Sequence, residues 1–168
     1  MQRTFYTIGY EGSQVEDFVH TLKQQGIATL VDVREMPLSR KRGFSKTALR
    51  DTLTSHGIAY VHLRGLGDPK PGREAARSGD YPRFRHIFGQ HMQTDYAQHD
   101  LQEAMKLVCA APACLMCFEH DHCNCHRSIV AQHLVEKARL KVHNLVVEAK
   151  PQPRERNLYI PHQPALAY

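Results

Sequence analysis

The sequence contains no long apolar run. Across its 168 residues, no stretch approaches the roughly 18 to 20 consecutive apolar residues that a helix needs to cross a bilayer. The N-terminal residues Met1–Phe5 also lack the apolar segment of a secretory signal. We therefore expect a cytoplasmic protein with no membrane among its partners.

Internal repeats and low-complexity tracts are absent as well. A length of 168 residues and a hydrophobic fraction of 42% are sufficient for one domain with its own core. From Ala149 onward the chain becomes polar and carries Pro151, Pro153, Pro161 and Pro164. We expect a single domain over residues 1–148, followed by a proline-rich tail over residues 149–168 that either wraps the domain or is mobile.

The cysteines are too few and too clustered for a disulfide framework. There are five, an odd number, and four of them fall within the twelve residues from 114 to 125. This arrangement favours a reducing compartment. We therefore expect these cysteines to be thiols, metal ligands or core residues.

Short apolar runs alternate along the chain with stretches of helical periodicity. The runs are nearly continuous in apolar character, as in strands covered on both faces, and their alternation with helices is typical of βαβ units. The sequence therefore predicts an α/β fold of three layers, with a mainly parallel five-stranded sheet of Rossmann-like type and helices on both faces. The expected strands are Thr4–Tyr10, Thr29–Arg34, Ala59–Leu63, Cys114–Glu119 and Val142–Val147.

Helix signals lie between these runs. Ser13 is a candidate cap for a helix that ends at Gly26, and a second helix is expected over residues 47–56, before Gly57. Residues 64–72 are rich in glycine and proline, so we expect a lid or binding loop there. Residues 74–108 and 126–140 have helical periodicity.

Polar side chains follow the expected strands. Gly9 and Tyr10 end the first strand, Asp32 and Arg34 end the second, and Glu119 ends the fourth. Ligands bind at the carboxyl ends of parallel strands because loops and helix N-termini present free N–H groups there. We expect Asp32, Arg34 and Glu119 to share one pocket mouth with Arg127.

The segment from Cys117 to Arg127 is the densest in reactive groups. Cys125 at a helix start beside Arg127 is a candidate nucleophile, because the helix dipole and the guanidinium stabilise a thiolate. Arg127 is a candidate for bidentate anion binding, and Glu119 for orienting it or acting as a base. The alternative is that Glu119 and Arg127 form a structural ion pair and that Cys125 only packs.

Two phosphate-binding signatures are missing. A phosphatase loop needs five residues between the cysteine of a His-Cys pair and an arginine. Here only three residues separate Cys123 from Arg127. The Gly65-x-Gly67 pair lacks the third glycine and the strand-to-helix turn of a dinucleotide site.

A zinc site is a weaker alternative. Four clustered cysteines and the nearby histidines offer enough soft ligands for tetrahedral zinc. However, Cys114 and Cys117 should point to opposite faces of a strand, which opposes shared coordination.

One segment is especially rich in basic residues. Residues 34–50 hold six basic residues and one acid, within a chain of net charge +5. An anionic partner is expected at this segment, with Arg34 and Arg40 as anion-binding residues, unless the segment is only a solvated loop.

Three motifs together resemble a known family. They are Thr7-Ile8-Gly9-Tyr10, Val31-Asp32-Val33-Arg34 with Pro37, Ser39 and Phe44, and Cys117-x-Glu119-x5-Cys125-His126-Arg127. Over roughly residues 4–148 the chain is similar to the family called domain of unknown function 488. The resemblance implies an intracellular bacterial or archaeal α/β domain, and it brings no established activity. Positions matching the family pattern are Gly9, Asp32, Arg34, Ser39, Glu119, Cys125, His126 and Arg127.

These observations predict an enzyme, or an enzyme-like binder, whose ligand is a phosphorylated small molecule or a nucleic acid. Two alternatives remain, a nucleic-acid-binding module without catalysis and a thiol-redox or zinc protein. A divalent metal is compatible with the site, zinc being the less expected, and no metal ligand is assigned. The expected catalytic residues are Asp32, Glu119, Cys125 and His126, and the expected anion-binding residues are Gly9, Tyr10, Arg34, Ser39, Arg40 and Arg127.

Overall fold

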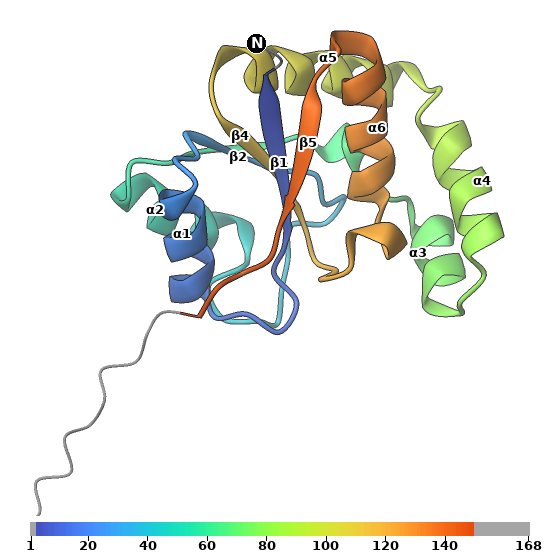
Figure 1. The fold of residues 1–168 in the computed structure, drawn as a ribbon. Coiled ribbons are helices and arrows are strands. Elements are labelled where there is room, and N and C mark those ends of the chain that lie inside the picture. Colours follow the sequence, from blue (N-terminus) through green and yellow to red (C-terminus); the bar gives the residue numbers. More distant parts are fainter. Residues whose placement is uncertain (1–2, 150–168) are drawn as a thin grey trace, which may run out of the picture.

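The computed structural model describes residues 3–149, and these form a five-stranded sheet with helices on both faces (Figure 1). Every strand pairs in parallel with its neighbours, in the order β3-β2-β4-β1-β5. The predicted three-layer α/β fold is therefore confirmed. The strands are β1 (Thr4–Gly9), β2 (Thr29–Asp32), β3 (Ala59–His62), β4 (Ala113–Cys117) and β5 (Lys141–Leu145).

The helices divide into two layers. One face of the sheet carries α1 and α2, whose Phe18 and Leu49 pack with Ile8 and Leu30 of the strands. The other face carries the remaining helices, which pack against Val31 and Leu115 among others. The helices are α1 (Val15–Gln24), α2 (Lys46–Ser55), α3 (Lys70–Arg77), α4 (Tyr81–His91), α5 (Asp95–Ala110) and α6 (His126–Ala138), with short 3₁₀ turns η1 (Arg64–Leu66) and η2 (His122–Asn124).

The chain path creates a crevice beside β4. From β1 and β2 the chain continues into α1 and α2 on one face, whereas from β4 it continues into α6 on the opposite face. Since β4 lies between β1 and β2, neighbouring strands send their loops in opposite directions at their carboxyl ends. Such a switch of direction leaves an open space between the loops, which is where open α/β sheets bind ligands.

Two local predictions were wrong. The residue before α1 is Gln14, not Ser13, and no side chain caps that helix. Residues 64–72 are not a plain loop, because they contain η1 and the first turn of α3, with Pro71 near its start. Proline is tolerated there because the first amides of a helix have no intrahelical acceptor.

Other boundaries lie within a few residues of their predicted positions. Gly26 and Gly57, which follow α1 and α2, have φ values of 64° and 75°, as expected of residues that end helices. Within residues 3–149, no helix combines the length and apolar character needed to cross a bilayer. The predicted tail, apart from Ala149, lies outside the described residues.

Candidate functional site

A cavity of about 900 Å³ opens at the carboxyl ends of the strands. Its size is in the usual range for small-molecule sites, roughly 300–1,000 Å³. Side chains from the loops after β1, β2 and β4, and from α3, line it. Of the residues predicted from the sequence, Tyr10, Arg34, Ser39, Arg40, Glu119 and His126 line this cavity.

The second strand ends in a buried ion pair. Asp32 has no exposed surface, and the Arg34 guanidinium donates to its two carboxylate oxygens at 2.9 and 2.7 Å. Tyr60 also donates its hydroxyl to Asp32, at 2.5 Å. Both oxygens of Asp32 are therefore occupied, and this carboxylate does not line the cavity.

Arg34 is held on a second side. Its Nη1 donates to the Tyr10 hydroxyl at 3.0 Å and to the Phe44 carbonyl at 2.8 Å. The Tyr10 ring stacks on Phe44, with ring centroids 4.3 Å apart. Burial opposes the charge, but the hydrogen bonds and the charge of Asp32 outweigh it and raise the pKa of Arg34. Since these contacts use most of the five N–H groups of the guanidinium, Arg34 shapes the cavity wall.

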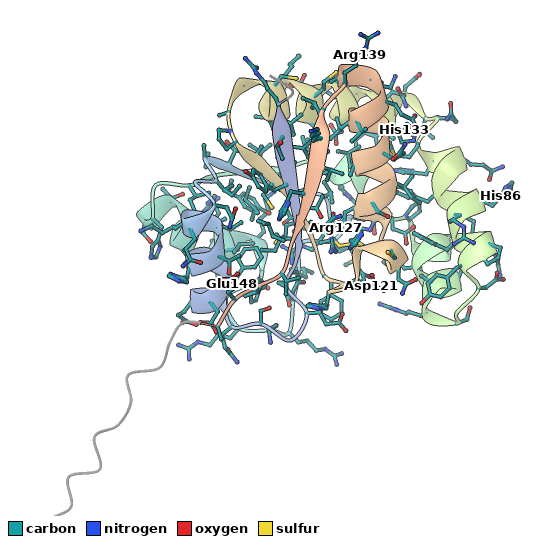
Figure 2. The ribbon with its side chains drawn as sticks, in the orientation of Figure 1. His86, Asp121, Arg127, His133, Arg139 and Glu148 are labelled. Atoms are coloured by element: carbon teal, nitrogen blue, oxygen red, sulfur yellow. A yellow bond between two sulfur atoms is a disulfide. The ribbon has the colours of Figure 1, made fainter. Side chains whose placement is uncertain are left out.

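Arg127 is the largest fully buried side chain among the described residues. Its guanidinium donates to the main-chain carbonyls of Glu119 and His120, to Thr7 and to the Cys117 sulfur. Burial lowers the pKa of Arg127, and the charge of Glu119 opposes that effect. In Figure 2 this side chain lies between the sheet and the start of α6.

These contacts give Arg127 a different place from the expected one. Its donors hold the loop after β4, and it does not line the cavity. The ion pair considered as an alternative is absent too, because within residues 3–149 no carboxylate oxygen lies in ion-pair distance of Arg127. We therefore assign Asp32, Arg34 and Arg127 to the framework of the site.

Gly9 lets two loops approach. A Cβ atom at Gly9 would lie 1.8 Å from the Glu119 carbonyl oxygen and 3.0 Å from Nη1 of Arg127. Only glycine leaves room for that carbonyl. Gly9 thus sets the position of the loop after β4 and does not line the cavity.

Cys117 and Cys125 are paired as a disulfide in the structure. Both are core residues, as one of the expectations had it, but they are not free thiols, because the chain turns back after β4 and brings residue 125 beside the strand end. Cys109, Cys114 and Cys123 are free. Cys114 packs on the face opposite Cys117, as the strand alternation predicted.

His126 lines the cavity in a fixed orientation. Its Nε2 is 2.8 Å from the Val33 carbonyl oxygen, which only accepts hydrogen bonds, so Nε2 carries the proton. The unprotonated Nδ1 then faces the Cys125 sulfur, at 3.8 Å. Burial lowers the pKa of His126 and favours this neutral ring.

Asp68 is a cavity residue that the sequence analysis did not single out. It is 7% exposed, and its Oδ1 is the one buried side-chain oxygen or nitrogen without a hydrogen-bond partner among residues 3–149. Burial raises the pKa of Asp68 to about 7; Arg73 opposes this shift, and Glu119 and Glu35 add to it. The signal available in the sequence was its place in the glycine- and proline-rich segment 64–72.

The cavity rim is both basic and apolar. Arg40, Lys70 and Arg77 line it and are exposed, and within the described part of the chain Arg40 and Arg77 form no ion pair. Three exposed apolar side chains share the same lining. They are Met36, Leu38 and Phe118, which are 53%, 69% and 44% exposed.

Comparison with known proteins supports the family suggested by the three motifs. No curated protein and no solved structure shows a significant match to the chain. The model of the family described as Domain of unknown function DUF488 matches residues 14–134, which include Asp32, Arg34 and the whole segment from Cys117 to Arg127. The chain belongs to this family.

Proposed function

We propose that this protein is an enzyme that binds a nucleotide-sized phosphorylated ligand in the cavity and hydrolyses its phosphate ester. The observation that carries the proposal is that Asp68, a carboxyl with a pKa of about 7, shares one cavity with Arg40 and Arg77, which form no ion pair within residues 3–149. A perturbed titratable group in a cleft is a typical mark of a catalytic site.

The cations support a phosphorylated ligand. Arg40 and Arg77 reach the cavity from two different segments, the loop after β2 and α3. Because they have no carboxylate partner within residues 3–149, their guanidinium groups are free to bind phosphate oxygens. Lys70 adds a third positive charge, although its ammonium lies 3.9 Å from Glu74.

The apolar rim supports a ligand with a planar or apolar part. Exposed apolar side chains scattered singly need no explanation, but Met36, Leu38 and Phe118 border one opening. An aromatic ring such as Phe118 stacks well on a nucleobase. Phosphate on the cations and a base on the rim together describe a nucleotide, or one unit of a nucleic-acid strand.

Asp68 is suited to proton transfer. A group with a pKa near 7 exchanges protons readily at neutral pH, and general acid–base catalysis contributes typically 10²–10⁴-fold to a rate. We assign Asp68 as the general acid that protonates the leaving oxygen while water attacks the phosphorus. The phosphorus–oxygen bond to the leaving group breaks, and Asp68 regains its proton from solvent.

The test uses titration calorimetry with nucleoside monophosphates, together with hydrolysis of p-nitrophenyl phosphate and its diester. Arg40→Ala and Arg77→Ala should each weaken nucleotide binding by about tenfold. Asp68→Asn should retain binding and lower the hydrolysis rate at least about 100-fold.

Arg85→Ala is the matched control, because Arg85 is an exposed arginine of α4 outside the cavity lining. It should leave both binding and hydrolysis unchanged. An equal loss of nucleotide affinity in the Arg85→Ala and Arg77→Ala variants would contradict the proposed anion site. Hydrolysis by Asp68→Asn at the wild-type rate would contradict the proposed acid.

A second candidate function is favoured by one observation. Arg40, Arg42, Lys46 and Arg50 are exposed within eleven residues, a surface that suits the backbone of a nucleic acid. Binding of single-stranded oligonucleotides without hydrolysis, falling at least tenfold between roughly 50 and 200 mM salt, would support this function instead.

A further inference from the structure

We propose that Cys117, Cys125 and Glu119 form a zinc-type metal site when the two cysteines are reduced, with His126 as the nearest further ligand. This inference does not rest on phosphate-ester hydrolysis, because the donor atoms define the site by themselves. The Sγ atoms of both cysteines and a carboxylate oxygen of Glu119 all lie within 4.8 Å of one another.

The backbone spacing suits an ion between the two sulfurs. The Cα atoms of Cys117 and Cys125 are 7.6 Å apart, whereas disulfides usually span about 4.4–6.8 Å. Two thiolates on one tetrahedral zinc, each at about 2.3 Å, hold their sulfurs about 3.8 Å apart. The wider Cα spacing leaves room for that separation.

The surrounding charges balance a divalent cation. Two thiolates and the Glu119 carboxylate carry three negative charges, and Arg127 with a divalent ion carries three positive charges. Nη1 of Arg127 donates to the Cys117 sulfur at 2.9 Å, and the Arg127 amide donates to Cys125 at 3.5 Å. Such N–H groups stabilise thiolates in a buried site. The guanidinium, which has no carboxylate in ion-pair distance within residues 3–149, gains an anionic partner.

His126 is prepared to join these ligands. Its Nε2 proton is held by the Val33 carbonyl, which is the arrangement that orients metal-binding histidines. The free Nδ1 is 3.8 Å from the Cys125 sulfur. Donor atoms at this separation are close enough to bind one ion.

The site adjoins the cavity. Cys117, Glu119 and His126 all contribute to the cavity lining, so an ion bound by three ligands has an open position facing that space. A metal with an open position binds a water molecule or an anionic oxygen, which is the property of catalytic zinc sites.

Metal binding requires the reduced pair. A phosphine reductant breaks the Cys117–Cys125 bond with water, yielding two thiols and the phosphine oxide. The ion then displaces the two thiol protons, which pass to the buffer. Oxidation back to the disulfide excludes the ion.

The experiment adds Co²⁺ to the full-length protein, reduced and handled without oxygen. We expect one ion per chain, with a thiolate-to-cobalt charge-transfer band that Zn²⁺ abolishes by competition. The oxidised protein should show no band. Absence of the band in the reduced protein would overturn the proposal.

Variants locate the ion. Cys117→Ser and Cys125→Ser should each lose the band, whereas the matched control Cys123→Ser should retain it. Cys123 is exposed and belongs to a second cluster with Asp121 and His122. Loss of the band in Cys123→Ser, with retention in Cys125→Ser, would place the ion at that surface cluster and refute the inference.

Glu119→Gln keeps both thiols and provides a test that does not disturb the sulfurs. It should lower the Co²⁺ affinity at least about tenfold, while circular dichroism shows an unchanged fold. Unchanged affinity in a folded Glu119→Gln variant would contradict the three-ligand site.

Discussion

At the scale of single residues, the main feature of the site is a carboxyl group kept from water. Asp68 lies at the N-terminal side of α3, and a Cβ atom at Gly72 would come within 2.0 Å of its Oδ1. Any larger residue at position 72 would displace this carboxyl. A carboxyl group held in this way lowers the stability of the folded protein when it ionises. Natural proteins retain such destabilising groups chiefly where function needs them.

Asp68→Asn should therefore stabilise the protein at alkaline pH. The carboxyl has a raised folded-state pKa, from 3.8 to about 7, so its cost to stability is absent below pH 4 and grows as pH rises toward 7. Asparagine cannot ionise, so at pH 8 the variant should unfold with a free energy higher by a few kcal/mol, about 4 at most. Urea unfolding of both proteins from pH 4 to 8 measures this difference. A difference in the free energy of unfolding that narrows as pH rises would contradict the account.

The Asp32–Arg34 pair should behave as a structural element. Asp32→Asn leaves a buried guanidinium without its counter-charge, and we expect a loss of about 3–5 kcal/mol in the free energy of unfolding. The same substitution at Asp51, whose pair with Arg50 is largely exposed, should change stability by less than about 0.5 kcal/mol. Similar losses at both positions in denaturant unfolding would show that burial is not the cause.

At the scale of secondary structure, the sequence predicted the strands and most of the helices. β1 and β4 are buried on both faces, so they appear as continuous apolar runs that a sequence reveals directly. Only the first turn of α3 was predicted as a loop, because it contains Pro71 and Gly72, which usually mark loops. The packing of α3 against α4 depends on contacts that no local pattern shows.

Substitutions at two glycines distinguish the effect of packing between elements from the effect of helix propensity. Gly9→Ala should destabilise the protein and disturb the loop after β4, because its Cβ would collide with the Glu119 carbonyl. Gly89→Ala, within α4 and with nothing inside 4 Å, should raise stability by about 0.5–1 kcal/mol. Thermal unfolding of both variants tests this contrast, and a stable Gly9→Ala protein would refute the close approach.

At the scale of the whole molecule, the topology fixes where the site lies. β4 is central, and the chain leaves it toward the face opposite the one that it takes after the neighbouring strands β1 and β2, so the segments after these three strands converge at one edge of the sheet. The sequence predicted this convergence from the polar residues after each strand. It also predicted that Glu119 and Arg34 would lie near the opening, and both line the cavity.

The roles within the site were less accessible to sequence reasoning. Arg34 and Arg127 have the same side chain as Arg40, yet their donors are used by Asp32, Phe44 and main-chain carbonyls. Which arginines retain free donors depends on contacts between residues far apart in the chain. Asp68 escaped notice for the same reason, since its pKa is raised by burial and shifted by the charges of Arg73, Glu119 and Glu35, two of which lie far from it in the chain.

The central claim is that the cavity binds a phosphorylated ligand, and NMR titration of the ¹⁵N-labelled protein with adenosine monophosphate tests it most directly. The account predicts saturable amide shifts in residues 34–40, 68–77 and 117–126, with none in α1. Shifts spread over the basic surface of residues 40–50 that disappear at moderate salt, or no shifts at all, would contradict it.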